Sequence, residues 1–303
     1  MTTSSRTAKH SSAEQESMLS SLPALDAETR LAKPSTLLLG YVVISIVVAP
    51  MNLSSWLMDE VLLPAFRLSH GLVFPNLIVG LAVLLLTLVL IFWPARLTLS
   101  DIGLRRSGLK PSLIAVLAIW GTLQIATLLT ALAVGDGLSL NPIWTNGSLS
   151  GIGRFVSQLF GTGPAEESLF RGILLIQVFF ILSEKRPQST RRMIALAMLV
   201  SAVAFAVPHV PNRILNESYS GVASVLLDQS GLVLAGLVFA WIYLSTGNLW
   251  FSIGLHALIN APTPVLASPL DGDGYYQMIL LFGIILPFLV PRLRRWVASW
   301  LQT

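Results

Sequence analysis

Eight stretches of this chain are apolar over a length that approaches or reaches that of a membrane-spanning helix. They are residues 36–58, 72–93, 111–134, 164–183, 192–210, 221–245, 249–261 and 275–291. A helix needs about 20 largely apolar residues to cross the hydrocarbon core of a bilayer. The seventh stretch is too short to cross alone, so we expect neighbouring helices to shield it. The sequence therefore predicts an all-α, polytopic membrane helix bundle with about eight transmembrane helices.

Composition supports a lipid bilayer as the main surroundings of this chain. Only 11% of its residues are charged, whereas soluble domains carry about 25%. The absence of cysteine excludes disulfides and thiolate metal sites. The small net charge of +4 is carried mainly by loops, where basic residues report membrane orientation. We therefore expect the bilayer, and no nucleic acid, as a partner.

The basic residues also predict how the chain is oriented. If the N-terminus is inside and the eight segments alternate, 15 of the 19 basic residues fall on the inner side. We therefore predict a multi-pass protein of the cell membrane with both termini cytoplasmic. Residues 1–34, rich in Ser, Thr and Ala, are expected to form a disordered cytoplasmic tail. Residues 35–303 are expected to form the multi-pass membrane domain.

The fourth apolar segment opens with two adjacent carboxylates and a guanidinium. Gly163 and Pro164 are typical of a helix start. Glu167 and Arg171 are four residues apart, so they share a helix face and favour a structural ion pair. Glu166 is rotated by about 100° from Glu167 and lacks that partner. It is either a functional carboxylate or an interfacial residue in water.

Further polar side chains fall at a similar predicted depth in other segments. His209 ends the fifth segment, and His256 and Asn260 share one face of the seventh. With alternating segments, these three and the carboxylates all fall in the outer half of the membrane. Ionisable groups at membrane depth are costly and usually line a cavity or pathway. The shared depth therefore predicts one common site.

Each of these groups also has a purely structural interpretation. The Glu167–Arg171 pair may serve only to fix its helix, as such pairs often do. His209 is flanked by prolines and would then bond a carbonyl freed by a kink. His256 and Asn260 would then hydrogen-bond between helices. The residue patterns alone leave these alternatives open.

Three short motifs, taken in order, resemble a known family. They are Glu-Glu-x-x-x-Arg, Phe-x-x-x-His and His-x-x-x-Asn, each at an apolar segment. Together they resemble the CAAX-protease and bacteriocin-processing (CPBP, ABI) family of intramembrane glutamic endopeptidases, which is related to the type II CAAX prenyl proteases. The resemblance covers a core at about residues 110–262. The matching residues are Glu166, Glu167, Arg171, Phe205, His209, His256 and Asn260.

The resemblance implies roles for the catalytic residues. Glu166 and His209 would polarise a water molecule for attack on a peptide carbonyl. His256 and Asn260 would donate hydrogen bonds to the developing oxyanion. The substrate would be a peptide or a membrane-associated protein. Because the charge pattern places the site in the outer half, we favour a substrate other than a prenylated cytoplasmic protein.

The remaining motif residues would support the catalytic glutamate. Glu167 and Arg171 would orient Glu166, and the dipole of a helix beginning at residue 164 would keep that carboxylate ionised. We expect no cofactor. Glu166 with His209 and His256 is also a plausible set of zinc ligands, so a zinc-dependent protease that uses the same residues is an alternative.

Two functions from other classes compete with the peptidase. A non-catalytic immunity or scaffold protein would retain the fold, but it has no need to keep the whole set of polar residues. A transporter with a Glu/His proton relay would carry polar residues through both halves of the membrane. The inner half of this chain shows almost none. The peptidase is therefore the favoured hypothesis.

Overall fold

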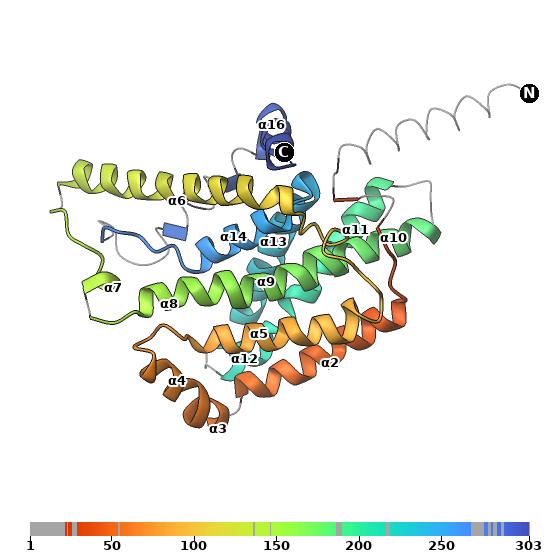
Figure 1. The fold of residues 1–303 in the computed structure, drawn as a ribbon, viewed down its shortest axis with the longest axis horizontal. Helices are drawn as coiled ribbons and strands as arrows, with labels where there is room; N and C mark the ends of the chain where they lie inside the picture. Colours follow the sequence, from red (N-terminus) through yellow and green to blue (C-terminus); the bar gives the residue numbers. More distant parts are fainter. Residues whose placement is uncertain are drawn as a thin grey trace, which may run out of the picture.

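The computed structural model of this protein is helical throughout the residues it describes (Figure 1). No strand occurs among those residues, and Leu140 and Leu266 form an isolated antiparallel bridge between two loops. The model describes residues 22, 24–25, 29–53, 55–135, 137–145, 147–185, 190–215, 219–267, 276–277, 280, 284–285 and 288–302. The all-α fold class predicted from the apolar segments is thus confirmed for this part of the chain.

The helices follow one another with short connections. The α-helices are α2 (Pro34–Leu53), α3 (Ser55–Leu57), α4 (Leu63–Leu68), α5 (Pro75–Thr87), α6 (Arg106–Val134), α7 (Pro142–Thr145), α8 (Ser150–Ser157), α9 (Gly163–Glu166), α10 (Ile176–Lys185), α11 (Thr190–Ala206), α12 (His209–Leu215), α13 (Val222–Thr246), α14 (Leu249–Asn260) and α16 (Pro291–Gln302). Four π-helical stretches join them, namely η1 (Met58–Leu62), η2 (Leu88–Phe92), η3 (Gln158–Thr162) and η4 (Glu167–Leu175).

Four of the described helices are long and apolar enough to cross a membrane. They are Pro75–Phe92, Arg106–Val134, Thr190–Pro211 and Val222–Thr246. Two shorter apolar helices, Pro34–Val47 and Leu249–Asn260, accompany them. The predicted count of eight is therefore not confirmed. The predicted segment 275–291 lies largely outside the described residues.

The helix that carries the two carboxylates begins well before the predicted start. Residues from Ser150 to Lys185 form one uninterrupted helical run, α8–η3–α9–η4–α10, which passes through the middle of the molecule (Figure 1). The prediction of a helix start at Pro164 was therefore wrong. A proline inside an α-helix removes one hydrogen bond and clashes with the carbonyl four residues earlier. The wider π-helical turn of η3 directly precedes Pro164, and Gly163 donates to the carbonyl of Gln158 there.

Small residues let α5 approach this helical run closely. A Cβ atom added at Gly80 would collide with the backbone of Gly161 and lie 2.5 Å from the backbone nitrogen of Thr162. A Cβ added at Gly161 would lie 2.9 Å from Cα of Leu77. Such close backbone contact between helices is typical of membrane proteins, where small residues replace the hydrophobic effect as the basis of helix association.

Helix α14 is the most deeply buried of the short helices. Nine of its residues are buried, including Leu249, Phe251 and Leu255. Gly247 ends α13 in the left-handed region at φ 62°, and the Asn248 side chain accepts from the backbone N–H of Phe251 to cap α14. The turn predicted between these helices is confirmed, as is the shielding of the short segment by its neighbours.

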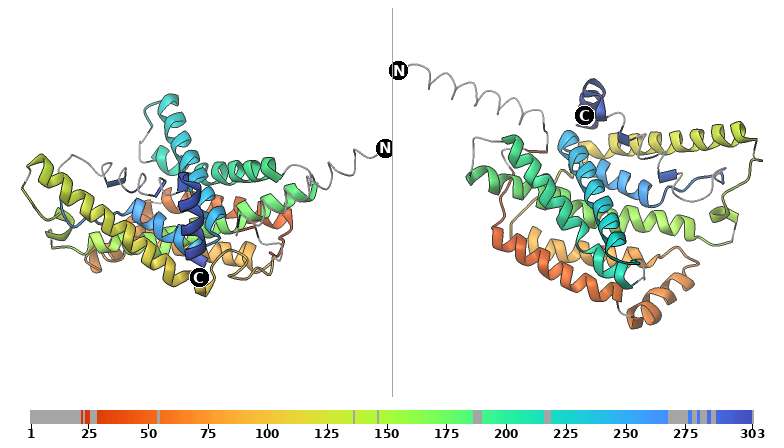
Figure 2. Two further views of the ribbon diagram at one scale, coloured as in Figure 1. Left: turned by 90° about the horizontal axis from the view of Figure 1, so that it is seen from above. Right: turned by 180° about the vertical axis from the view of Figure 1, so that it is seen from behind.

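Helix α13 runs at a steep angle to α6 and α9 in both views of Figure 2. It packs against α11 and α14. A cavity at the centre of the bundle is bounded by these helices together with α2 and α5.

The segment before α2 is bound to the helical run that carries the carboxylates. The backbone N–H of Ala32 donates to Oε1 of Gln177 at 2.7 Å, and Nε2 of Gln177 donates to the carbonyl of Arg30 at 2.7 Å. Residues 29–33, which were included in the predicted tail, are thus held against α10. Residues 1–21 of that tail lie outside the described part of the chain.

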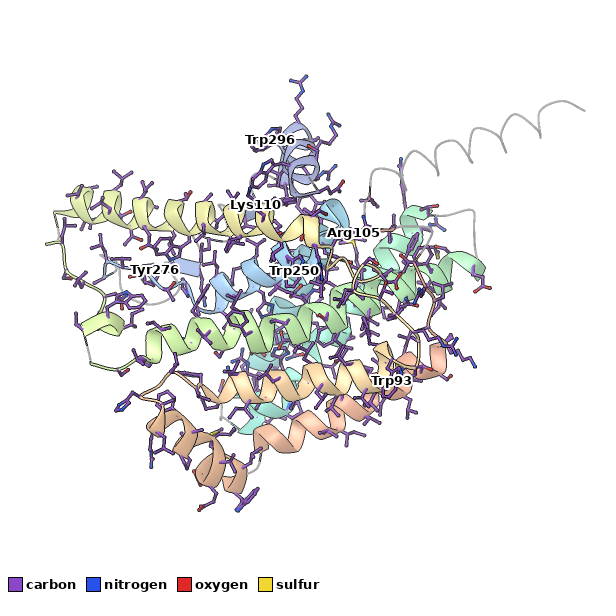
Figure 3. All side chains as sticks on the ribbon, viewed as in Figure 1. Trp93, Arg105, Lys110, Trp250, Tyr276 and Trp296 are labelled. Carbon is purple, nitrogen blue, oxygen red and sulfur yellow. The ribbon has the colours of Figure 1, made fainter. Side chains whose placement is uncertain are left out.

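Several basic segments meet at one end of the bundle. Nη1 of Arg30 donates to the carbonyl of Arg96, and the indole N–H of Trp250 donates to the carbonyl of Arg105. Arg105, Lys110, Trp93 and Trp250 are labelled in Figure 3. The grouping of these segments agrees with the charge pattern on which the predicted orientation rests. That orientation stays a prediction.

Candidate active site

A cavity of about 380 Å³ lies among the helices at the middle of the long helical run. Glu166, His209, His256 and Asn260 all line it. They come from α9, α12 and α14, which are distant in sequence. The structure thus brings together the four residues that the resemblance assigned to catalysis. The remainder of the wall comes mainly from α2, α5, α11 and α13.

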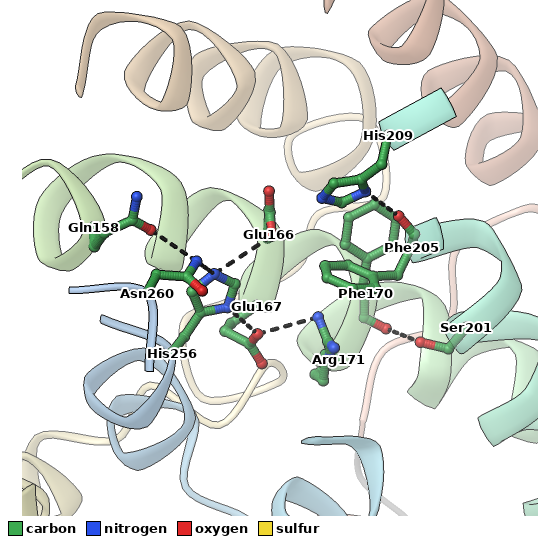
Figure 4. Close-up of polar contacts among 10 residues, drawn as sticks. All are labelled: Gln158, Glu166, Glu167, Phe170, Arg171, Ser201, Phe205, His209, His256 and Asn260. Carbon is green, nitrogen blue, oxygen red and sulfur yellow. Dashed lines mark hydrogen bonds and ion pairs between the residues drawn. The ribbon is translucent and has the colours of Figure 1, made fainter. Parts of the chain in front are cut away.

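Glu167 binds two partners behind this cavity. Its Oε1 lies 2.8 Å from Nδ1 of His256 and 3.1 Å from Nη1 of Arg171 (Figure 4). The Glu167 side chain is fully buried and that of Arg171 is 1% exposed. Desolvated charges persist in such a place only when they are paired. The predicted ion pair is confirmed, but Glu167 contacts His256 instead of Glu166.

Two aromatic rings complete the surroundings of Arg171. Its guanidinium carbon lies 4.5 Å from the ring centroid of Phe205 and 5.2 Å from that of Phe239. A cation over an aromatic face is attracted by the ring quadrupole, and more strongly when both are desolvated. These rings, together with Glu167, fix the guanidinium between η4, α11 and α13.

Glu166 faces the cavity from the opposite side of His256. Its side chain is 22% exposed, and its Oε2 lies 3.6 Å from Nε2 of His256. Two adjacent carboxylates therefore approach the two nitrogens of one imidazole (Figure 4). The π-helical η4 begins at Glu167, directly after Glu166. π-Helical turns occur frequently at functional sites.

The helix dipole does not act on Glu166 in the way the sequence predicted. The helical run begins at Ser150, several turns before Glu166. The dipole effect falls off within the first turn. That part of the prediction was wrong, and the electrostatic setting of Glu166 is determined by Arg171, His256 and its exposure to the cavity instead.

His209 is fixed by a carbonyl that the proline kink leaves free. Its Nδ1 lies 2.9 Å from the carbonyl oxygen of Phe205, four residues earlier. α11 ends at Ala206, and Pro208 precedes the start of α12. A carbonyl oxygen can only accept, so Nδ1 carries the proton and Nε2 of neutral His209 holds a lone pair. The structural interpretation of this histidine is thus correct for Nδ1 and leaves Nε2 available to the cavity.

Gln158 belongs to the same hydrogen-bond chain, and the sequence analysis missed it. Nδ2 of Asn260 donates to Oε1 of Gln158 at 3.0 Å and lies 2.9 Å from Nε2 of His256. Gln158 lines the cavity and is 8% exposed. Because the helix was expected to begin at 164, a glutamine at 158 had no reason to be placed beside the site.

The N-terminal helices also contribute to the cavity. Asn76, Val79 and Gly80 of α5 and Ile44 of α2 line it. None of them belongs to a recognisable motif, so only the tertiary structure could place them there.

The described residues contain no group of three or more His, Cys, Asp or Glu side chains arranged to hold a metal ion. Glu166, His209 and His256 line one cavity without forming such a group. The zinc alternative is therefore left to a direct experiment.

Residues 148–262 match the model of the family described as type II CAAX prenyl endopeptidase Rce1-like. This region is Rce1-like. The Rce1-like region runs from just before α8 to just after α14, and it contains all six of the predicted site residues as well as Gln158. It agrees with the family that the three motifs resemble. No curated protein and no solved structure matches the chain.

Proposed function

We propose that this protein is an intramembrane endopeptidase that hydrolyses a peptide bond with water activated by Glu166 and His209. The observation that carries the proposal is the convergence of Glu166, His209 and His256 on one cavity within an apolar helix bundle. The Rce1-like region, whose family is described as a prenyl endopeptidase, supports the same class of reaction. The protein is accordingly a hydrolase.

In the proposed reaction, a water molecule binds between Glu166 and Nε2 of His209. Glu166 takes a proton from it as general base, and the water oxygen attacks the carbonyl carbon. The tetrahedral intermediate collapses when the C–N bond breaks, and Glu166 returns the proton to the leaving amine. The products are a carboxylate and an amine, and no cofactor is consumed. The surrounding helices exclude bulk water and strengthen these interactions.

The other residues of the site act around this step. His256 and Asn260 form the wall that faces the carbonyl oxygen as it becomes negative. Glu167 and Arg171 position the His256 ring, since Oε1 of Glu167 lies 2.8 Å from its Nδ1. This differs from the role implied by the resemblance, in which the pair orients Glu166. A buried ion pair is well suited to hold a ring in one orientation.

The cavity supports a substrate with an apolar portion. Ile44, Val79, Val83 and Leu232 lie on its wall, apart from the polar residues. We propose a peptide or membrane-associated protein as the substrate, and a multi-pass location in the cell membrane with both termini cytoplasmic. Whether the apolar portion is a side chain or a prenyl group is tested by offering both.

The experiment uses the full chain, purified and reconstituted in lipid vesicles. It is incubated with matched sets of prenylated and non-prenylated peptides, and cleaved bonds are located by mass spectrometry. Glu166→Ala and His209→Ala are compared with the native chain. Glu60→Ala is the matched control, because Glu60 is an exposed carboxylate of η1 outside the cavity. Each protein is assayed with and without a chelator.

The proposal predicts cleavage by the native chain and by Glu60→Ala, and its loss in both site variants, unchanged by the chelator. Loss of activity with chelator and rescue by zinc would move the assignment to a metalloprotease. A folded native chain that cleaves no peptide in either set would contradict the peptidase and favour a non-catalytic membrane protein.

A further inference from the structure

The hydrogen-bond chain that ends at Asn260 leaves an unexpected group facing the cavity. Nδ1 of His256 lies 2.8 Å from the Glu167 carboxylate, which only accepts, so Nδ1 carries a proton. Nε2 of the neutral ring then accepts, and Nδ2 of Asn260 lies 2.9 Å away as its donor. The second hydrogen of Nδ2 is directed at Oε1 of Gln158, at 3.0 Å.

Both hydrogens of the Asn260 amide are therefore used inside the protein. Its Oδ1 is a carbonyl oxygen and cannot donate. Nε2 of His256 holds a lone pair in this arrangement. The two residues expected to supply oxyanion donors thus have no N–H directed into the cavity while His256 is neutral.

Gln158 has what they lack. Its Oε1 accepts from Asn260, so its Nε2 is turned away from Asn260, toward the side on which the Glu166 carboxylate lies (Figure 4). Nε2 makes no hydrogen bond to any described residue and is not among the buried polar atoms that lack a partner. Because Gln158 lines the cavity, this amide offers two N–H groups to a bound molecule.

We propose that Gln158 is a further catalytic residue, whose Nε2 donates a hydrogen bond to the carbonyl oxygen of the scissile peptide as it becomes an oxyanion. This inference rests on the proposed peptidase function. Asn260 then acts as a positioning residue, because its bond to Oε1 determines which end of the Gln158 amide faces the substrate. A preorganised amide donor of this kind contributes mainly in the transition state.

The backbone of the site supports this role. Gln158 begins η3 and Glu166 ends α9, so both belong to one continuous helical run. The base and the donor are therefore held by the same rigid element. Gly161 and Gly80 bring α5 into backbone contact with that element between the two residues. Groups on rigid secondary structure keep their geometry better than groups on loops.

Three variants separate donation from the positioning of Asn260. Gln158→Met removes both the donor and the acceptor. Gln158→Glu keeps an oxygen that accepts from Asn260 but removes the N–H groups when ionised. Asn76→Asp is the matched control for added negative charge, because Asn76 lines the cavity from α5 without joining the hydrogen-bond chain. Thermal unfolding verifies that each variant is folded.

The readouts are kcat, KM and the affinity of a peptidyl phosphonate built on a peptide that the native chain cleaves. Its tetrahedral, anionic oxygens occupy the place of the oxyanion. We expect Gln158→Met and Gln158→Glu to lower kcat by about 10²–10³-fold. The affinity for the phosphonate should fall by a similar factor while KM changes little. Asn76→Asp should lose much less of either.

Native kcat and phosphonate affinity in Gln158→Glu would overturn the proposal, because they would show that Gln158 serves only as an acceptor for Asn260. An equal loss in Asn76→Asp and Gln158→Glu would also overturn it, since charge alone would explain the effect. If Gln158→Met does not fold, the nearly isosteric Gln158→Glu decides. A native chain that cleaves nothing removes the proposed function and this inference together, whereas cleavage that tolerates every Gln158 variant removes this inference alone.

Discussion

Oε1 of Glu167 and Nδ1 of His256 are 2.8 Å apart, although the two residues lie on helices that are distant in sequence. The same oxygen lies 3.1 Å from Nη1 of Arg171. A fully buried carboxylate thus connects a fixed cation to the ring that faces the cavity. It specifies the tautomer of His256, because a carboxylate oxygen accepts and the ring nitrogen beside it must donate.

The first prediction concerns this contact. Glu167→Gln preserves the size of the side chain but removes the charge that aligns His256 with Arg171. Displacement of a catalytic group by about 1 Å can cost about 10²-fold in rate. We expect kcat to fall by about that factor while the protein stays folded, as measured by peptide cleavage in vesicles. Glu60→Gln is the control, and a native kcat in Glu167→Gln would show that the contact does not position the ring.

The second prediction concerns the stability of the buried ion pair. Arg171→Met leaves the Glu167 carboxylate buried without its cation, a change that typically costs about 3–5 kcal/mol. The free energy of unfolding, measured by equilibrium denaturation in mixed micelles, should fall by that amount. The double variant Arg171→Met/Glu167→Gln should recover part of it, because no unpaired charge then remains. Equal stability of Arg171→Met and the native chain would mean that water or another group solvates Glu167.

The third prediction concerns the contact between α5 and the central helical run. Gly80→Ala places a methyl group against the backbone of Gly161. Overpacking of this kind typically costs about 1–3 kcal/mol. Gly121 of α6 is the matched control, because a Cβ there meets nothing within 4 Å. Gly121→Ala should leave stability unchanged or raise it by up to about 1 kcal/mol. Equal unfolding free energies for the two variants would show that α5 moves away without cost.

The sequence predicted the parts of the fold that depend on local pattern. Apolar length and the Thr246–Gly247–Asn248 turn predicted α13 and α14, and the four-residue spacing predicted the pair of Glu167 and Arg171. The shared depth of the polar residues predicted one site, and the structure places Glu166 and His256 in one cavity.

The sequence did not predict features that depend on tertiary contact. Pro164 was interpreted as a helix start because a π-helical turn that accommodates it has no sequence signal. That error removed Gln158 from consideration and placed Glu166 near a helix dipole. The contact of Glu167 with His256 also could not be predicted, because it depends on how η4 and α14 pack.

The central claim is that the Glu166 carboxylate is the base that activates water. The most direct test is the single-turnover cleavage rate of Glu166→Gln in vesicles, with peptide binding measured separately on the same sample. The substitution keeps the shape of the side chain and removes its basicity. General base catalysis contributes about 10²–10⁴-fold. We therefore predict a loss of that size in the cleavage rate with peptide binding retained, and cleavage at the native rate by Glu166→Gln would contradict the account.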